Sequence, residues 1–180
     1  MAVLWSKLYQ HRPGRPIEGK SDSVSTVAEQ AKFLGHRYMS RKMRRLALAK
    51  GTTSLKQIQS FDCKPNEQTT LTICQLIETL ELLYPETYGN ISTNLHLSNF
   101  NTRTLCQDFA TFSDALFRNG IRWPLILAFL AFSGALAEEC TRHGRSNTIL
   151  SILNWIQCFT ALRLSPWIEE RGGWVRWFIQ

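Results

Sequence analysis

Histidines and adjacent carboxylates are the side chains of this sequence that could carry acid–base chemistry. The four histidines, His11, His36, His96 and His143, lie in different segments and form no HExxH motif. The carboxylates of Glu138–Glu139 and Glu169–Glu170 are neighbours in sequence, so they point to different parts of a helix surface. Capping and solubility are the ordinary roles of such pairs. We therefore expect no enzyme, no cofactor and no metal site.

The cysteines give no support for a disulfide framework or a zinc site. They are odd in number, widely spaced and free of any CxxC pair: Cys63, Cys74, Cys106, Cys140 and Cys158. Most stand among apolar residues, where a thiol behaves as a small hydrophobe. We expect free thiols and a reducing compartment, in which the NIS sequon at Asn90 has no role.

Positive charge gathers in two stretches of a chain with a net charge of +7, HRPGRP (11–16) and HRYMSRKMRR (36–45). Such clusters could contact nucleic acid or an acidic membrane surface. No Lys/Arg stripe recurs along the chain and no nucleic-acid-binding module is recognisable, so we expect no nucleic-acid partner. The simpler interpretation is a solvated face of an amphipathic helix, and contact with a membrane stays open.

Apolar residues recur at helical spacing along the chain, and no strand pattern competes with them. We expect helices over 24–49, 69–84, 86–95, 101–118, 123–141 and 147–163, then a short helix in PWIEER with Ser165 as its N-cap. Residues 50–68 are expected to form a loop with at most one helical turn. We therefore predict an all-α fold, with a flexible N-terminal arm over residues 1–23 and one domain over 24–180.

The stretch RWPLILAFLAFSGALAEEC (122–140) is the most apolar part of the chain. From Leu125 to Ala137 only Ser133 and Gly134 interrupt its apolar character. A membrane-spanning helix needs about 20 apolar residues, whereas runs of about 10–14 are more often core helices. We predict a helix that is covered on all sides by others and that forms a central hairpin with residues 147–163.

Two motifs carry a resemblance to a known family. ALFRNGIRWPLILAFLAFSGALA (115–137) resembles the first homology motif of the Bcl-2 family, and PWIEERGGWVRWF (166–178) resembles the second. YPETYGNISTNLHLS (84–98) resembles the end of the third motif. Residues 27–43 are similar to the first helix of the ovarian killer branch. The resemblance covers about residues 24–180 and implies a Bcl-2-like bundle with a surface hydrophobic groove, in a divergent invertebrate or viral member.

The resemblance also implies a site, because the family binds amphipathic BH3-type helices in its groove. The positions that match the lining of the groove are Leu80, Tyr84, Tyr88, Phe112, Leu116, Trp123, Ala128 and Phe132. Leu125 stands where the family has a groove arginine, and Arg122 is a candidate to replace that cation. Gly134 lacks a Cβ within an apolar helix, which predicts close approach by another helix or by the ligand at the edge of the groove.

The third motif departs from the family pattern, with Ile73, Ile77 and Glu78 at its Leu, Gly and Asp positions. This departure makes the third-motif helix a poor ligand for other family members. It therefore favours a protein whose groove receives a partner's helix over one that donates its own. We therefore expect a pro-survival regulator that binds BH3-type helices of pro-apoptotic relatives. The alternative is a pro-apoptotic effector of the Bok/Bak type that permeabilises the outer mitochondrial membrane. The expected location is the cytosol and the cytoplasmic face of the outer mitochondrial or ER membrane, with the C-terminal anchor outside these 180 residues.

Overall fold

The computed structural model describes residues 26–58, 60–89 and 101–176, and helices are the only regular elements in these ranges. They are α2 (Thr26–Arg45), α3 (Ala49–Lys56), α4 (Glu67–Leu83), α5 (Pro85–Gly89), α7 (Thr102–Leu116), α8 (Trp123–Arg142), α9 (Thr148–Phe159), the π-helix η2 (Thr160–Leu164), α10 (Ser165–Glu170) and α11 (Gly173–Arg176). The all-α prediction is confirmed. The predicted arm over 1–23 lies outside the described residues, as does the end of the helix expected over 86–95.

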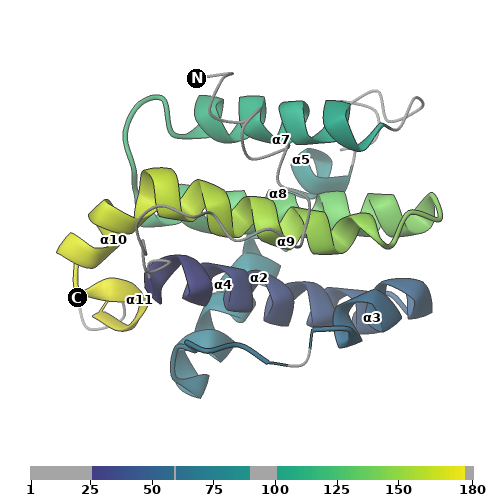
Figure 1. Cartoon of the computed structure of the whole chain (residues 1–180), viewed down its shortest axis with the longest axis horizontal. Helices are drawn as coiled ribbons and strands as arrows, with labels where there is room; N and C mark the ends of the chain where they lie inside the picture. Colours follow the sequence, from purple (N-terminus) through teal and green to yellow (C-terminus); the bar gives the residue numbers. More distant parts are fainter. Residues whose placement is uncertain (1–25, 59, 90–100, 177–180) are drawn as a thin grey trace, which may run out of the picture.

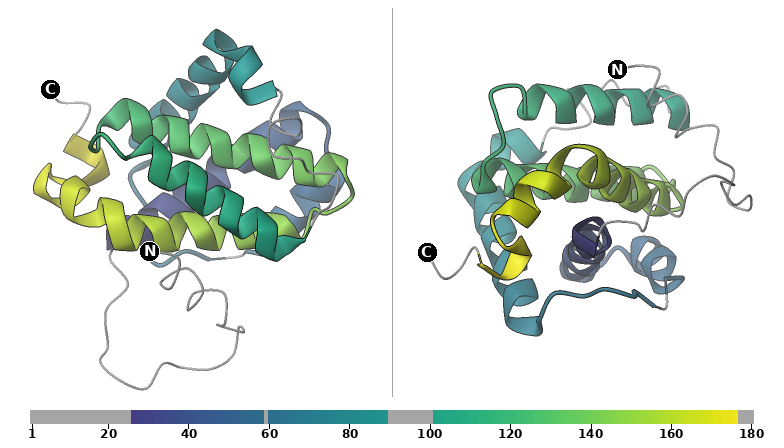
Figure 2. Two further views of the ribbon diagram at one scale, coloured as in Figure 1. Left: turned by 90° about the horizontal axis from the view of Figure 1, so that it is seen from above. Right: turned by 60° about the vertical axis from the view of Figure 1, so that its left-hand side comes forward.

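The α8–α9 hairpin occupies the middle of the molecule (Figure 1). α7 lies on one side of it, and α2 and α3 lie on the other, while α10 and α11 close one end (Figures 1 and 2). α8 contacts α2, α3, α4, α5, α7 and α9, so the prediction of a covered central helix is confirmed. By length and composition α8 could also cross a membrane, but 72% of its most apolar stretch is buried inside the bundle.

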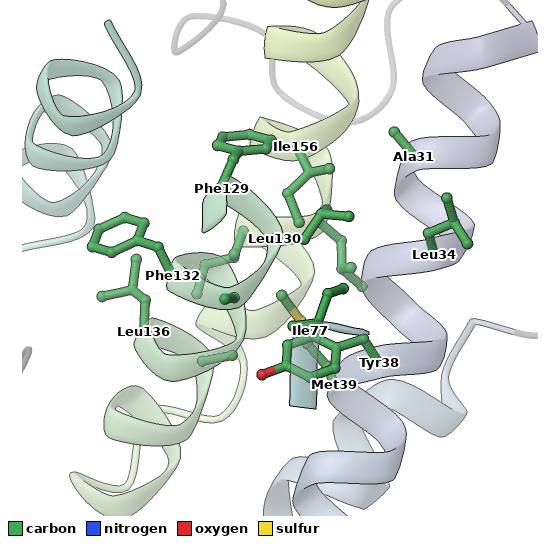
Figure 3. Close-up of a cluster of buried hydrophobic side chains, with 14 of the residues drawn as sticks. Ala31, Leu34, Tyr38, Met39, Ile77, Phe129, Leu130, Phe132, Leu136 and Ile156 are labelled. Carbon is green, nitrogen blue, oxygen red and sulfur yellow. The ribbon is translucent and has the colours of Figure 1, made fainter. Parts of the chain in front are cut away.

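The core forms where α8 meets α2, α4 and α9. Figure 3 shows Phe129 and Leu130 of α8 beside Ile156 of α9. Tyr38 of α2 points toward α8. The aliphatic side chains of the third motif, Ile73 and Ile77 on α4, are fully buried in this cluster. Burial of this apolar surface holds α4 against the central hairpin.

Polar side chains fix where two of the helices begin. The side chain of Asn66 accepts a hydrogen bond from the backbone N–H of Thr69 at 2.7 Å, and this cap starts α4 two residues before the predicted position. Asn101 caps α7 in the same way, accepting from the N–H of Arg103 at 3.0 Å. These caps satisfy backbone donors that would otherwise lack partners at the helix start.

Three local predictions were wrong. The helix expected to reach residue 49 ends at Arg45, because the chain turns at Ala47 (φ +54°) and re-enters a helix, α3, where a loop was expected. α3 forms because Leu55 is buried against the core and packs α3 back onto α2. Ser165 is not an N-cap, since α9 runs through η2 into α10 without a break and buries the Ser165 hydroxyl.

All five cysteines are free thiols, as predicted. Burial raises the pKa of Cys74 and Cys106 to about 11 and that of Cys140 to about 12. Burial also raises the pKa of Cys158. Cys63 lies in the loop between α3 and α4 and is partly exposed.

Because the thiolate is the reactive form, we expect limiting iodoacetamide near neutral pH to alkylate Cys63 first, as read by peptide mass spectrometry. In urea all five should react alike; native labelling of Cys140 at a comparable rate would contradict this expectation.

Candidate functional site

Apolar side chains that remain partly or largely exposed gather on the elements around α8. α4, α5 and α7 each contact α8, which runs between them in Figure 2. We call these residues the apolar strip: Leu76, Leu80, Leu83, Tyr84, Tyr88, Phe112, Leu116, Leu125 and Ala128. Leu83 is 67% exposed and Tyr84 is 56% exposed, which is unusual for such large apolar groups. An exposed apolar patch of this kind is typical of a binding surface.

Leu76 and Leu83 were not predicted as site residues. Their signal was present in helical spacing, because Leu76 precedes Leu80 by four residues and Leu83 follows it by three. Leu80 itself is partly buried against the core, as is Tyr88 of α5. Helix α4 therefore presents a row of leucines beside its buried isoleucines.

Phe112 and Phe132, which were each predicted to line the groove, lie in contact. Their rings stack, with centroids 3.7 Å apart and an interplanar angle of 18°. Phe132 is only 5% exposed, whereas Phe112 is partly exposed on α7. Phe112 is therefore the member of the pair at the surface, and Phe132 supports it from α8.

Trp123 faces the C-terminal helices. Its ring lies edge-on to Trp167 of α10, with centroids 5.2 Å apart, and 5.9 Å from Trp174 of α11. Trp174 is buried, and its indole N–H donates to the carbonyl of Val27 at 3.1 Å. Trp123 thus joins the first and second homology motifs through aromatic packing, a role that the sequence did not indicate.

Gly134 faces α2. A Cβ at this position would lie 2.2 Å from Cε1 of Tyr38, a side chain with no exposed surface. The expected close approach is thus made by a helix of the same chain. Gly134 is a packing residue of the α2–α8 contact, and we leave it out of the apolar strip.

Arg122 stands at the start of α8. It is exposed and makes no ion pair within the residues that the structure describes. Its carbonyl accepts a hydrogen bond from the N–H of Leu125 at 3.0 Å, which places the two residues on the same first turn. An unpaired cation therefore stands close to the leucine that replaces the groove arginine of the family.

A network of ion pairs ties α4 to α2 and α8. Nζ of Lys42 lies 2.5 Å from Oε1 of Glu81 and 3.1 Å from Oε2 of Glu138. Arg41 makes a bidentate contact with Glu78, at 2.9 and 3.2 Å, and Arg45 reaches Glu81 at 3.4 Å. Lys42 is only 5% exposed, so the interpretation of the whole 36–45 cluster as a solvated face was wrong for this residue.

We expected no Walker loop from the sequence, yet GRPIEGKS (14–21) has the residue spacing of this phosphate-binding motif. Such a loop joins a strand to a helix. Residues 14–21 lie outside the described residues, and there is no strand among residues 26–58, 60–89 and 101–176. The spacing alone therefore assigns no nucleotide site.

Comparison with known proteins agrees with this architecture. Residues 73–174 match the family described as apoptosis regulator proteins, Bcl-2 family. Rat Bcl-2-like protein 1 is 32% identical over 97 residues, 54% of this chain and 40% of that protein. Dog apoptosis regulator Bcl-2 is 33% identical over 91 residues, 51% of this chain and 37% of that protein. The chain thus spans about two fifths of the length of these relatives.

Two solved structures share the fold. The crystal structure of chicken BOK has a TM-score of 0.73 at 23% identity and covers 88% of this chain and 98% of its own. Trichoplax adhaerens trBcl-2L2, in a crystal structure bound to trBak BH3, has a TM-score of 0.69 at 20% identity and covers 86% of this chain and 97% of its own. An all-helical bundle closed around a buried apolar helix, arranged as in these structures, is a Bcl-2-like fold. The chain belongs to the Bcl-2 family of apoptosis regulator proteins, which are not enzymes.

Proposed function

We propose that this chain is a pro-survival regulator that binds BH3-type helices of pro-apoptotic relatives along the apolar strip. The observation that carries the proposal is the exposure of large apolar side chains at the end of α4, beside partly exposed ones on α5 and α7 around α8. An amphipathic helix binds such a surface through apolar anchors at helical spacing. The solved complex of trBcl-2L2 with trBak BH3, a relative with the same fold, supports this mode.

The packing of α4 against the bundle supports a pro-survival role over a pro-apoptotic one. A helix that is donated to a partner must first leave its own bundle. Ile73 and Ile77 of α4 are fully buried, and Glu78 is held by Arg41. Releasing α4 would expose both isoleucines and break this ion pair, so α4 is a poor donor.

The alternative is an effector that inserts the α8–α9 hairpin into the outer mitochondrial membrane. The length and apolar composition of α8 favour it, as does the similarity of residues 27–43 to the ovarian killer branch. Under either function we propose association with mitochondrial or ER membranes, as expected for the family. A liposome-release assay separates the two functions, because only the effector should release vesicle contents.

A peptide titration tests the proposed site. Isothermal titration with a panel of BH3 peptides is expected to give at least one dissociation constant in the micromolar range or tighter. Leu83→Glu should weaken that peptide by about tenfold or more, since it places a charge among desolvated anchors. Leu162→Glu, at a leucine that is 49% exposed on η2, is the matched control and should bind normally. Absence of binding across the panel, or equal effects of the two variants, would remove the site.

Arg122 is expected to pair with the aspartate of a bound BH3 helix. Arg122→Ala should weaken an Asp-bearing peptide by about 1 kcal/mol, the scale of an exposed ion pair. The same change should barely affect a peptide in which that Asp is Ala, and a double-mutant cycle isolates the coupling. Arg118→Ala, at another exposed arginine, serves as the control. A coupling near zero would mean that recognition is apolar, with Leu125 extending the strip.

A further inference from the structure

The basic cluster of residues 36–45 has two faces. Arg41, Lys42 and Arg45 turn toward the acids of α4 and α8 described above. His36, Arg37 and Arg44 line a separate hollow beside α3. The ion-pair network therefore accounts for only half of the cluster, and the other half needs an explanation of its own.

The hollow lies between α2 and α3 and has a volume of about 310 Å³. It is lined by His36, Arg37, Ser40, Arg44, Thr52, Leu55, Lys56 and Ile58, a set that contains no acidic residue. A volume of this order suits a small molecule rather than a nucleic acid or a folded protein. The hollow is also distinct from the apolar strip, to which neither α2 nor α3 contributes a residue.

No acidic side chain among the described residues pairs with the arginines and the lysine of the hollow. Arg37 and Lys56 have no ion pair in the described part of the chain, and Arg44 donates only to the carbonyl of Ser40, at 3.1 Å. Burial lowers the pKa of His36; the hydrogen bond to the Leu55 carbonyl opposes this shift and the nearby Arg37 adds to it, so the positive charge of the hollow comes chiefly from the two arginines and the lysine. Three cations therefore surround one concave surface, where each repels the others until an anion enters.

His36 helps to hold the two walls together. Its Nε2 lies 3.1 Å from the carbonyl oxygen of Leu55 on α3, and its ring packs at 5.1 Å from that of Phe61. The buried Leu55 anchors α3 in the core at the same point. Arg37 and Arg44 on α2 and Lys56 on α3 are thus carried by elements that are fixed to each other, which limits the ordering that a ligand must impose.

We propose that this hollow binds a compact ligand with several phosphate groups, either a soluble polyphosphate or the headgroup of an anionic lipid. Guanidinium groups bind phosphate oxygens bidentately, and a lysine adds a point charge. Two arginines on α2 and one lysine on α3 can therefore contact phosphate groups from both walls of the hollow. A lipid headgroup held there would orient the α2–α3 side of the bundle toward a membrane.

Two experiments test the proposal. The first is calorimetric titration of the chain with inositol 1,4,5-trisphosphate and with inorganic phosphate. The second is flotation with phosphatidylcholine vesicles that carry phosphatidylinositol 4,5-bisphosphate or phosphatidylserine. The variant R37Q/R44Q/K56Q should lose about tenfold or more in affinity for the trisphosphate or the bisphosphate vesicles. The control K64Q/R118Q/R176Q removes equal charge from exposed sites elsewhere and should stay close to the parent. Circular dichroism melting checks that both variants fold.

The arms of the experiment separate the two sources of the ligand. Binding of the soluble trisphosphate with the expected loss in the variant supports a headgroup-sized site that needs no membrane. Binding to bisphosphate vesicles alone, lost in the same variant, assigns a lipid. Equal losses in variant and control would show that only bulk charge matters, and absence of binding to every probe at millimolar concentration would show an empty hollow; either result overturns the proposal.

Discussion

Lys42→Met is expected to lower the free energy of unfolding by about 3–5 kcal/mol. The ammonium of Lys42 is the common partner of Glu81 and Glu138 and is 5% exposed. Met matches the length of the side chain but leaves the Glu81 carboxylate, whose side chain is 9% exposed, facing an apolar neighbour. Arg45 at 3.4 Å compensates only part of that charge. Urea unfolding followed by circular dichroism measures the loss.

Arg142→Met is the matched control for this prediction. Arg142 pairs with the same Glu138 at 2.8 Å, but its side chain is 49% exposed, so the loss should stay within about 0.5 kcal/mol. Lys42→Met combined with Glu81→Leu should recover part of the stability, because a buried charge without a partner costs more than an apolar pair of similar volume. A loss below about 1 kcal/mol in the single variant would mean that water reaches the network.

The ion-pair network also bears on the proposed function. Glu78 and Glu81 flank Leu80 on α4, so the contacts that hold α4 to α2 also fix one side of the apolar strip. A surface that is already fixed loses less freedom when a helix binds it. The same contacts oppose release of α4, which is the reason we favour a receiver of helices over a donor.

Helical periodicity predicted the long helices because each buries an apolar stripe, and a stripe is visible in sequence. It missed α3, where Gly51, Ser54 and Leu55 are the only buried residues of an otherwise polar segment. A short helix of this kind is held by tertiary packing, since isolated helices of such length are marginal in water. The homology motifs supplied the fold beyond what spacing alone could give.

The candidate site was predictable in part. Spacing indicated that Leu80 and Tyr84 lie on one stripe and that Phe112 and Leu116 lie on another, because a helical pattern reports which side chains of one helix point the same way. That both stripes line one groove was implied by the resemblance alone. A helical pattern does not report which helix they meet. The partners of Trp123 and Lys42, which are the C-terminal tryptophans and the acids of α4 and α8, depend on the packing of elements far apart in sequence.

Gly134→Ala is expected to destabilise the protein by about 2 kcal/mol. Overpacking a core costs about 1–3 kcal/mol, occasionally more, and here the added methyl would lie 2.2 Å from an aromatic carbon of Tyr38. The ring cannot move away easily, since Tyr38 is fully buried between α2 and α8. Ala is favoured over Gly within a helix by about 1 kcal/mol. A net loss of unfolding free energy in Gly134→Ala therefore means that the clash with Tyr38 costs more than this gain.

Gly35→Ala gives the comparison that isolates the clash. Gly35 is also buried within a helix, but a Cβ there would meet the terminal Cδ1 of Ile156 at 2.9 Å, and a flexible methyl can turn aside. Both variants gain the same helix propensity, so their difference in unfolding free energy reports the rigidity of the Tyr38 ring. Adding Tyr38→Leu to Gly134→Ala should cost less than the sum of the single changes, because the shorter side chain makes room for the methyl. Additive costs would place the strain of Gly134→Ala elsewhere than in the contact between α2 and α8.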